Sequence, residues 1–167
     1  MYHRVLRSRK GAPTIQMPQP VPLSDIEGLR AFNICMTEQL DLCRKLEDLA
    51  DTLPSKVDTR IAMMLANRLK ATLRRCHCLE EDVIFPVLLR AGTDVADILG
   101  RLRHEHLEDE DHANDVRDAI RAFVTRQDRG DAEKLGYMLR CLFVSLRRHL
   151  AFDCDYVLPL FRRTAGL

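Results

Sequence analysis

Residues 95–123 read VADILGRLRHEHLEDEDHANDVRDAIRAF, and their mainly apolar side chains recur at alternating steps of four and three. This spacing keeps them on one face of an α-helix, because a helix completes a turn about every 3.6 residues. The stripe consists of Val95, Leu99, Leu102, His106, Asp109, Ala113, Val116, Ile120 and Phe123. The segment is therefore predicted to form one long helix that turns this stripe, His106 included, toward a core.

Two other segments carry stripes of the same kind. One runs through Leu29, Phe32, Met36, Gln39, Cys43, Leu46, Ala50 and Leu53, and the other through Leu135, Leu142, His149, Phe152, Tyr156 and Leu160. No segment alternates apolar and polar residues as a half-buried strand does. The pattern predicts an all-α fold, an antiparallel up-down four-helix bundle with short loops.

Capping residues and helix breakers set the expected helix ends. The predicted helices begin at Ser24, at Ser55 or Asp58, at Thr93 or Asp94, and after Gly130, and they end near residues 52, 90, 127 and 164. Ser24 and Glu27 have the spacing of a capping box. Pro86 and Pro159 are each predicted to kink or end a helix, because proline lacks the backbone N–H that the helix requires.

Composition limits the classes of protein that the chain can represent. Its 167 residues suit one domain, expected over residues 23–167, and residues 1–22 hold four prolines and are expected to form a flexible tail. The net charge of +1 gives no case for nucleic acid as a partner, and no apolar run is long enough for a membrane span. The six cysteines lie within apolar helical segments, which favours reduced thiols and a cytoplasmic location.

Three histidines are each followed by a carboxylate four residues later. The pairs are His77 with Glu81, His106 with Glu110, and His149 with Asp153. Residues four apart lie on one helix face, so each pair can direct an imidazole and a carboxylate toward one point. Three such helices around one core would form a cage of nitrogen and oxygen ligands, which suits iron, manganese or zinc.

The alternative to a metal is a buried network in which arginines neutralise the carboxylates. Five arginines crowd the same layer of the predicted bundle, namely Arg74, Arg75, Arg103, Arg147 and Arg148. The ligands also differ in strength, because the helical stripe favours Asp109 over Glu110 as the inward acid. Glu80 is a candidate to accept a hydrogen bond from a ligating histidine, and His104 is rotated away from His106.

Three motifs resemble those of the hemerythrin-like family of HHE cation-binding domains. They are HCLEEDVIFPVL at residues 77–88, RLRHEHLEDE at 101–110 and RRHLAFDCDYVLPLF at 147–161. EQLDLCRKLEDLA at 38–50 is similar to the rest of the family's first helix, so the resemblance covers about residues 23–164. It implies a four-helix bundle holding non-haem iron, with His77, Glu81, His106, His149 and Asp153 as metal ligands.

The chain departs from the family pattern at two places. The first-helix position that usually carries a histidine falls at Met36, whose thioether is a poor ligand for hard ferric iron. Glu110 stands where oxygen-carrying hemerythrins have a second third-helix histidine. A five-histidine, oxygen-carrying di-iron centre is therefore not expected.

The leading hypothesis is a soluble metal-binding protein that senses or handles iron, oxygen, peroxide or nitric oxide. Its metal would be mononuclear or di-iron, with manganese or zinc as alternatives, and its ligand a small diatomic molecule or peroxide. A regulatory or scaffolding bundle with a decayed metal site is the second hypothesis, and a di-iron oxidase or peroxidase is the third. Cys76, Cys78 and Cys154 lie beside ligand positions, so a thiol sensor is a further hypothesis. The sequence identifies no protein partner.

Overall fold

A computed structural model describes residues 23–126 and 131–167, and within these ranges every regular element is helical. The elements are α1 (Asp25–Thr52), α2 (Thr59–Leu79), the π-helical turn η1 (Glu80–Ile84), α3 (Phe85–Leu88), the 3₁₀ turns η2 (Leu89–Ala91) and η3 (Thr93–Val95), α4 (Ala96–Arg126), α5 (Asp131–Phe152), the π-helical turn η4 (Asp153–Val157) and α6 (Leu158–Ala165). The expected tail at 1–22 and the expected third-helix end at Gln127 lie outside the described residues.

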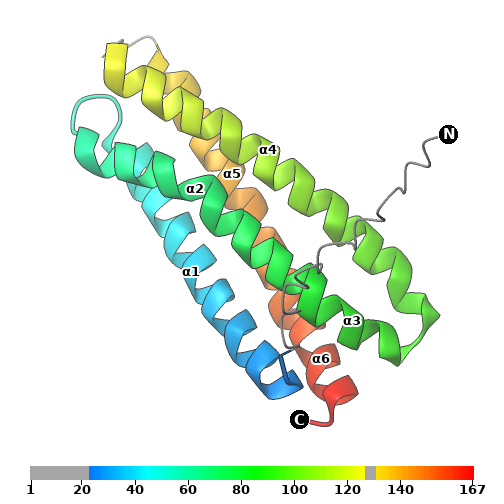
Figure 1. The fold of residues 1–167 in the computed structure, drawn as a ribbon. Helices are drawn as coiled ribbons and strands as arrows, with labels where there is room; N and C mark the ends of the chain where they lie inside the picture. The colour runs from blue at the N-terminus through cyan, green and yellow to red at the C-terminus, as the bar shows by residue number, and fades with distance from the viewer. Residues whose placement is uncertain (1–22, 127–130) are drawn as a thin grey trace, which may run out of the picture.

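The four long helices α1, α2, α4 and α5 form the bundle (Figure 1). Helix α1 packs against α2 and α5, and α4 packs against the same two helices, so α1 and α4 are diagonal to each other. The short helices α3 and α6 pack together at the end of the bundle where α1 begins. The predicted all-α, four-helix architecture is confirmed.

The helix starts follow the predicted caps. The Ser24 hydroxyl accepts a hydrogen bond from the Glu27 backbone, and the Glu27 carboxylate accepts one from the Ser24 backbone, which completes the capping box. Of the two candidates for the second helix, Asp58 is the N-cap, because its carboxylate accepts the backbone N–H groups of Arg60 and Ile61.

The stripe along α4 is confirmed at every position. All nine of its residues are buried, from Val95 to Phe123, and they include His106 and Asp109. On α1 the stripe is buried from Phe32 to Ala50. These faces form one continuous apolar core. It is interrupted by buried histidines and acids, among them His77, Glu80, His106, His149 and Asp153.

Pro86 and Pro159 do not end their helices. Each follows a π-helical turn in which a backbone N–H bonds the carbonyl five residues earlier, Phe85 to Glu80 and Leu158 to Asp153. A wide turn of this kind accommodates a residue that cannot donate a hydrogen bond, and π turns are frequent at functional sites. Glu80 and Asp153 are therefore the first residues of two matching turns.

The predicted stripe of the fourth helix is confirmed at Leu135, Leu142 and His149 and is wrong beyond them, where the π turn at Asp153 begins. Phe152, Tyr156 and Leu160 were expected to face the core, but they are only half-buried. The fully buried residues are instead Asp153, Val157 and Phe161. The extra residue in the wide turn shifts the inward face by one position along the chain, which a regular 3.6-residue repeat does not anticipate.

Two helical glycines offer a matched test of packing. A Cβ at Gly28 would lie 2.9 Å from Val83 Cγ1, whereas one at Gly100 would meet nothing within 4 Å. Alanine normally stabilises a helix interior by about 0.5–1 kcal/mol relative to glycine. Gly100→Ala is therefore expected to raise the free energy of unfolding by about that amount, and Gly28→Ala to lower it. Urea unfolding checks both, and a stabilised Gly28→Ala would contradict the close α1–η1 contact.

None of the described helices is both long and apolar enough to cross a membrane. All six cysteines are free: Cys35, Cys43 and Cys76 are buried, Cys78 and Cys154 are exposed, and Cys141 is intermediate. Cys76 and Cys78 thus point in opposite directions, as expected for alternate residues of a helix.

Candidate metal centre

Three histidines meet in the polar layer of the core. His77 comes from α2, His106 from α4 and His149 from α5, and each is at most 3% exposed. The His77 and His106 rings stack with centroids 4.1 Å apart, and the His106 and His149 centroids are 4.9 Å apart. Helices that lie apart in sequence therefore bring three imidazoles into one buried group.

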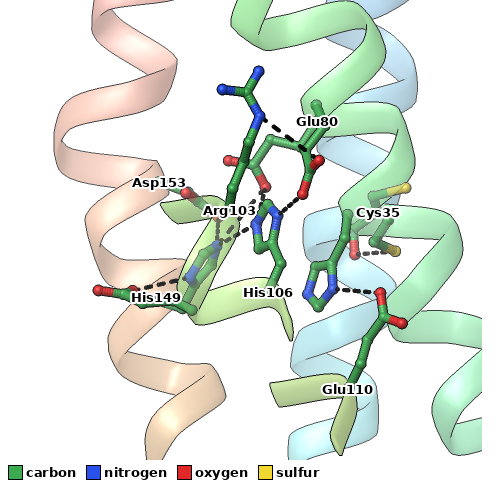
Figure 2. A network of polar contacts seen from close by, with 11 residues as sticks. Cys35, Glu80, Arg103, His106, Glu110, His149 and Asp153 are labelled. Atoms are coloured by element: carbon green, nitrogen blue, oxygen red, sulfur yellow. Dashed lines mark hydrogen bonds and ion pairs between the residues drawn. The ribbon is translucent and has the colours of Figure 1, made fainter. Parts of the chain in front are cut away.

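Glu80, at the start of η1, enters this group from α2's side of the bundle (Figure 2). Its Oε2 lies 3.3 Å from His106 Nε2 and 3.8 Å from His149 Nε2, and the two Nε2 atoms are 3.3 Å apart. Asp153 Oδ2 is 3.6 Å from His149 Nε2. We call Glu80, His106, His149 and Asp153 the inner cluster.

A second set of carboxylates faces the outer nitrogen of each ring. Glu110 Oε1 lies 3.3 Å from His77 Nδ1, Glu81 Oε1 lies 2.7 Å from His106 Nδ1, and Glu105 Oε2 lies 3.4 Å from His149 Nδ1. These side chains are 18–32% exposed, so their charge is partly solvated. We call Glu81, Glu105 and Glu110 the outer carboxylates.

Two of the outer carboxylates, Glu110 and Glu81, accept hydrogen bonds from the Nδ1 atoms of His77 and His106 and so orient these rings, whereas Glu105 lies near His149 Nδ1 without a hydrogen bond. A carboxylate at Nδ1 favours the tautomer with the proton on Nδ1, which leaves Nε2 with a lone pair. The Nε2 atoms of His106 and His149 lie 3.3 Å apart in the inner cluster, where both could bind a metal ion once they have released their protons (Figure 2). The same arrangement of carboxylate, histidine and metal recurs in metalloproteins, where it orients the ligand and raises its basicity.

The structure corrects the expected pairing of histidines and acids. Of the three i, i+4 pairs, only His149 and Asp153 lie within ion-pair distance among the described residues. Glu81 and Glu110 contact the histidines of neighbouring helices instead of their own. Same-helix spacing predicts which side chains share a face, but a bundle also brings acids from adjacent helices to each ring.

Glu81 was expected as a metal ligand and Glu80 as a hydrogen-bond acceptor for a ligating histidine, but their positions in the structure are the reverse. Glu80 is 1% exposed and lies in the core, whereas Glu81 is at the rim, where its Oε2 is 3.8 Å from Arg103 Nε. A signal for this was present, because Glu80 precedes Pro86 by six residues and Asp153 precedes Pro159 by six. Aligning the two motifs on their prolines selects Glu80. Nothing in the spacing indicated Glu105.

The remaining candidates lie around the centre. Asp109 is buried and accepts a hydrogen bond from Ser145 Oγ at 3.0 Å, so the stripe located it correctly, although it contacts no histidine closely. Met36 is buried on α1, as expected. His104 is exposed and pairs with Glu108, which places it outside the centre as predicted.

The arginine network does not form. Within the described residues, no arginine lies within ion-pair distance of Glu80 or Asp153. Arg75, Arg103 and Arg147 instead pair at the surface, with Glu38, Glu81 and Glu47 respectively. The two buried acids thus have no arginine partner, and the basic groups beside them are histidines.

Burial and mutual contact shift the pKa values of the inner cluster strongly. Burial opposes charge on Glu80, but hydrogen bonds from His106 and His149 outweigh it and lower the Glu80 pKa to about 2. Burial also opposes charge on His149, yet its contact with Glu80 and the charge of Asp153 raise the His149 pKa to about 9. Burial and the Glu80 charge raise the Asp153 pKa to about 8.

These shifts predict that the metal-free protein loses stability as pH rises from 6.5 to 9. In that window His149 keeps its proton when folded but loses it when unfolded, since its ordinary pKa is 6.5. Asp153 acts with the same sign up to about pH 8. His77, whose pKa burial lowers to about 3, acts oppositely only below pH 6.5.

The unfolding free energy of the metal-free protein should fall by on the order of 2 kcal/mol across the window, as measured by urea unfolding. His149→Gln should reduce the slope. A free energy that is flat or rises with pH would contradict the charge state assigned to His149.

The donor atoms suit a metal ion. Ligands about 2.1 Å from one metal lie roughly 3.0–3.4 Å from their neighbours, and two of the three contacts among Glu80, His106 and His149 are 3.3 Å. Glu80 Oε1, both oxygens of Asp153 and His77 Nε2 are buried without a hydrogen-bond partner in the described structure. Such groups are costly to bury unless a cation or a hydrogen bond satisfies them.

The fold and the site together define a helical bundle with a buried cation centre of histidines and carboxylates. The hemerythrin HHE cation binding domain family matches residues 35–161, and the chain belongs to this family. Comparisons with curated proteins and with solved structures gave no significant match. The matched range contains every residue of the inner cluster and all three outer carboxylates.

Proposed function

We propose that the inner cluster binds one non-haem iron ion, and that the protein uses it to sense or handle oxygen, peroxide or nitric oxide. The observation that carries this proposal is the triangle of Glu80, His106 and His149, the one buried group among the described residues whose ligand atoms all lie within 4.8 Å of one another. Two histidines and one carboxylate with open positions are the typical ligand set of non-haem ferrous iron.

The protonation states of the inner cluster determine how its residues would bind the ion. Glu80 is ionised because its pKa is low, so it offers a negative oxygen at neutral pH. His149 and Asp153 hold protons in the metal-free state and would release them on binding. Glu81 accepts a hydrogen bond from His106 Nδ1 and so would hold the His106 ring with Nε2 inward, and Glu105 lies on the Nδ1 side of His149.

A single ion fits the donor set better than two. His77 is stacked on His106, but its Nε2 has no partner within the described structure. The α1 position that usually supplies a histidine carries Met36, so a second ion near His77 would lack a nitrogen donor from that helix. Four protein ligands leave coordination positions open on an iron ion, and bound iron would supply one-electron redox chemistry there.

The location we propose is the cytoplasm. The cysteines are free, and three of them are buried within helices. Reduced buried thiols are typical of proteins in a reducing compartment.

Anaerobic loading with ferrous iron, followed by nitric oxide, tests the proposal. We expect about one iron per chain by elemental analysis, and an electron paramagnetic resonance signal that appears only with nitric oxide and iron together. Glu80→Gln should lose both, and His104→Ala, a histidine on α4 outside the centre, should keep both. Failure to retain iron, or iron that gives no response to nitric oxide, would favour a scaffolding bundle with a decayed site. Iron-dependent consumption of peroxide with turnover would instead favour an oxidase or peroxidase.

A further inference from the structure

A second chemical site lies between α1 and α2, apart from the inner cluster. Cys35 on α1 and Cys76 on α2 are buried at 3% and 2% exposure, and their sulfur atoms lie within 4.8 Å of each other. The Cys76 thiol also donates to the Cys35 backbone carbonyl at 3.8 Å. Two cysteines from different helices thus form a facing dithiol.

The Arg75 guanidinium contacts one sulfur of this dithiol. Arg75 Nη1 donates to Cys35 Sγ at 3.4 Å, and the same side chain pairs with Glu38. The Arg75 and Glu38 side chains are about half exposed, so the buried dithiol lies directly beside side chains that reach solvent. A cation held next to a cysteine stabilises its thiolate, which is the reactive form.

Cys35, Glu38 and Cys76 could also be read as ligands for a soft metal ion, because their donor atoms cluster. Arg75 argues against this reading, since its guanidinium contacts both Cys35 Sγ and Glu38 and already supplies the positive charge there. The contacts therefore favour thiol chemistry over metal binding at this place.

We propose that Cys35 and Cys76 form a peroxide-reactive dithiol that closes to a disulfide between α1 and α2. The Cys35 thiolate attacks one oxygen of hydrogen peroxide, the O–O bond breaks, and the departing hydroxide takes a proton to become water. The Cys76 sulfur then attacks the resulting sulfenic acid, the S–O bond breaks, and a second water leaves. Both thiols are oxidised, and one peroxide is reduced.

The other cysteines lack this environment. A hydrogen bond from Cys76 and the Arg75 charge lower the pKa of Cys35 to about 7. Burial raises the pKa of Cys43, about two helical turns further along α1, to about 11. Cys78 and Cys154 are free and exposed, so they offer matched controls.

The disulfide would lie next to the metal centre, since Cys76 directly precedes His77 and Cys35 directly precedes Met36. The proposal does not depend on iron, so the experiment uses the full-length protein both with a chelator and loaded with iron. Each sample is treated with stoichiometric hydrogen peroxide and digested without reduction, and cross-linked peptides are identified by mass spectrometry.

We expect a Cys35–Cys76 cross-link in both samples, reversed by dithiothreitol. Cys76→Ser should accumulate a sulfenic acid on Cys35 that dimedone traps, and Arg75→Gln should slow cross-linking by roughly fivefold at pH 7. The double variant Cys78→Ser/Cys154→Ser should cross-link like the parent protein, and Cys43 should stay reduced.

Three results would overturn the proposal. One is oxidation of Cys78 and Cys154 while Cys35 and Cys76 stay reduced. Another is a cross-link that forms only with iron present, which would indicate metal-driven oxidation. The third is zinc bound by Cys35 and Cys76 at one ion per chain, protecting both from peroxide. The chelated sample contains no iron, so it tests the dithiol whether or not the inner cluster binds iron.

Discussion

Replacing His106 with alanine is expected to abolish stoichiometric iron binding. His106 contacts Glu80 and His149 through Nε2 and Glu81 through Nδ1, so its ring is the link between the inner cluster and an outer carboxylate. The dissociation constant for ferrous iron should rise by more than about 100-fold, above the ~10–100-fold that loss of an orienting carboxylate typically costs. Anaerobic calorimetric titration of the metal-free protein measures it.

Two further variants should bind iron with affinities between those of His106→Ala and the parent protein, or equal to that of the parent. Glu81→Gln should fall in the intermediate range, about 10–100-fold weaker, because it removes only the group that orients His106. His104→Ala should bind as the parent protein does, since His104 lies two residues away on the exposed face of α4. Equal affinities for all three variants would show that iron binds elsewhere.

Metal binding is expected to raise thermal stability by a large amount. The buried Glu80 and Asp153 side chains have no arginine partner, and Glu80 Oε1 and both Asp153 oxygens lack a hydrogen bond, so a bound cation supplies a partner that these oxygens otherwise lack. With free metal at a thousand times the dissociation constant, mass action gives about 4 kcal/mol. For a chain of this size that corresponds to a rise in Tm of roughly 10 °C.

Differential scanning calorimetry with and without ferrous iron, under anaerobic conditions, measures the shift. His149→Ala removes one nitrogen donor and should show almost no shift with iron, although its metal-free form still unfolds cooperatively. Identical melting temperatures for the parent protein with and without iron would contradict the proposed role of the inner cluster.

The sequence predicts the bundle well because its core is periodic. The stripe on α4 located nine buried residues, including His106 and Asp109, and the capping box located the start of α1. Both signals depend on local helix geometry, which neighbouring residues determine. His106 and His149 were located for the same reason, because each lies on a predicted stripe.

The carboxylates were harder to predict because their placement depends on two non-local effects. The π turns before Pro86 and Pro159 interrupt the regular repeat, and the buried acids are the first residues of these turns, Glu80 and Asp153. Contacts between helices then pair each ring with an acid from another segment, as Glu105 pairs with His149. The Cys35–Cys76 dithiol was missed for the second reason, since those residues are 41 positions apart.

The most direct test of the inner cluster is a crystal structure of the iron-loaded protein with anomalous diffraction at the iron absorption edge. We expect one strong peak about 2.1 Å from the Nε2 atoms of His106 and His149, with an oxygen of Glu80 as a further ligand. A peak bound to other side chains, or none in protein shown to contain iron, would contradict it.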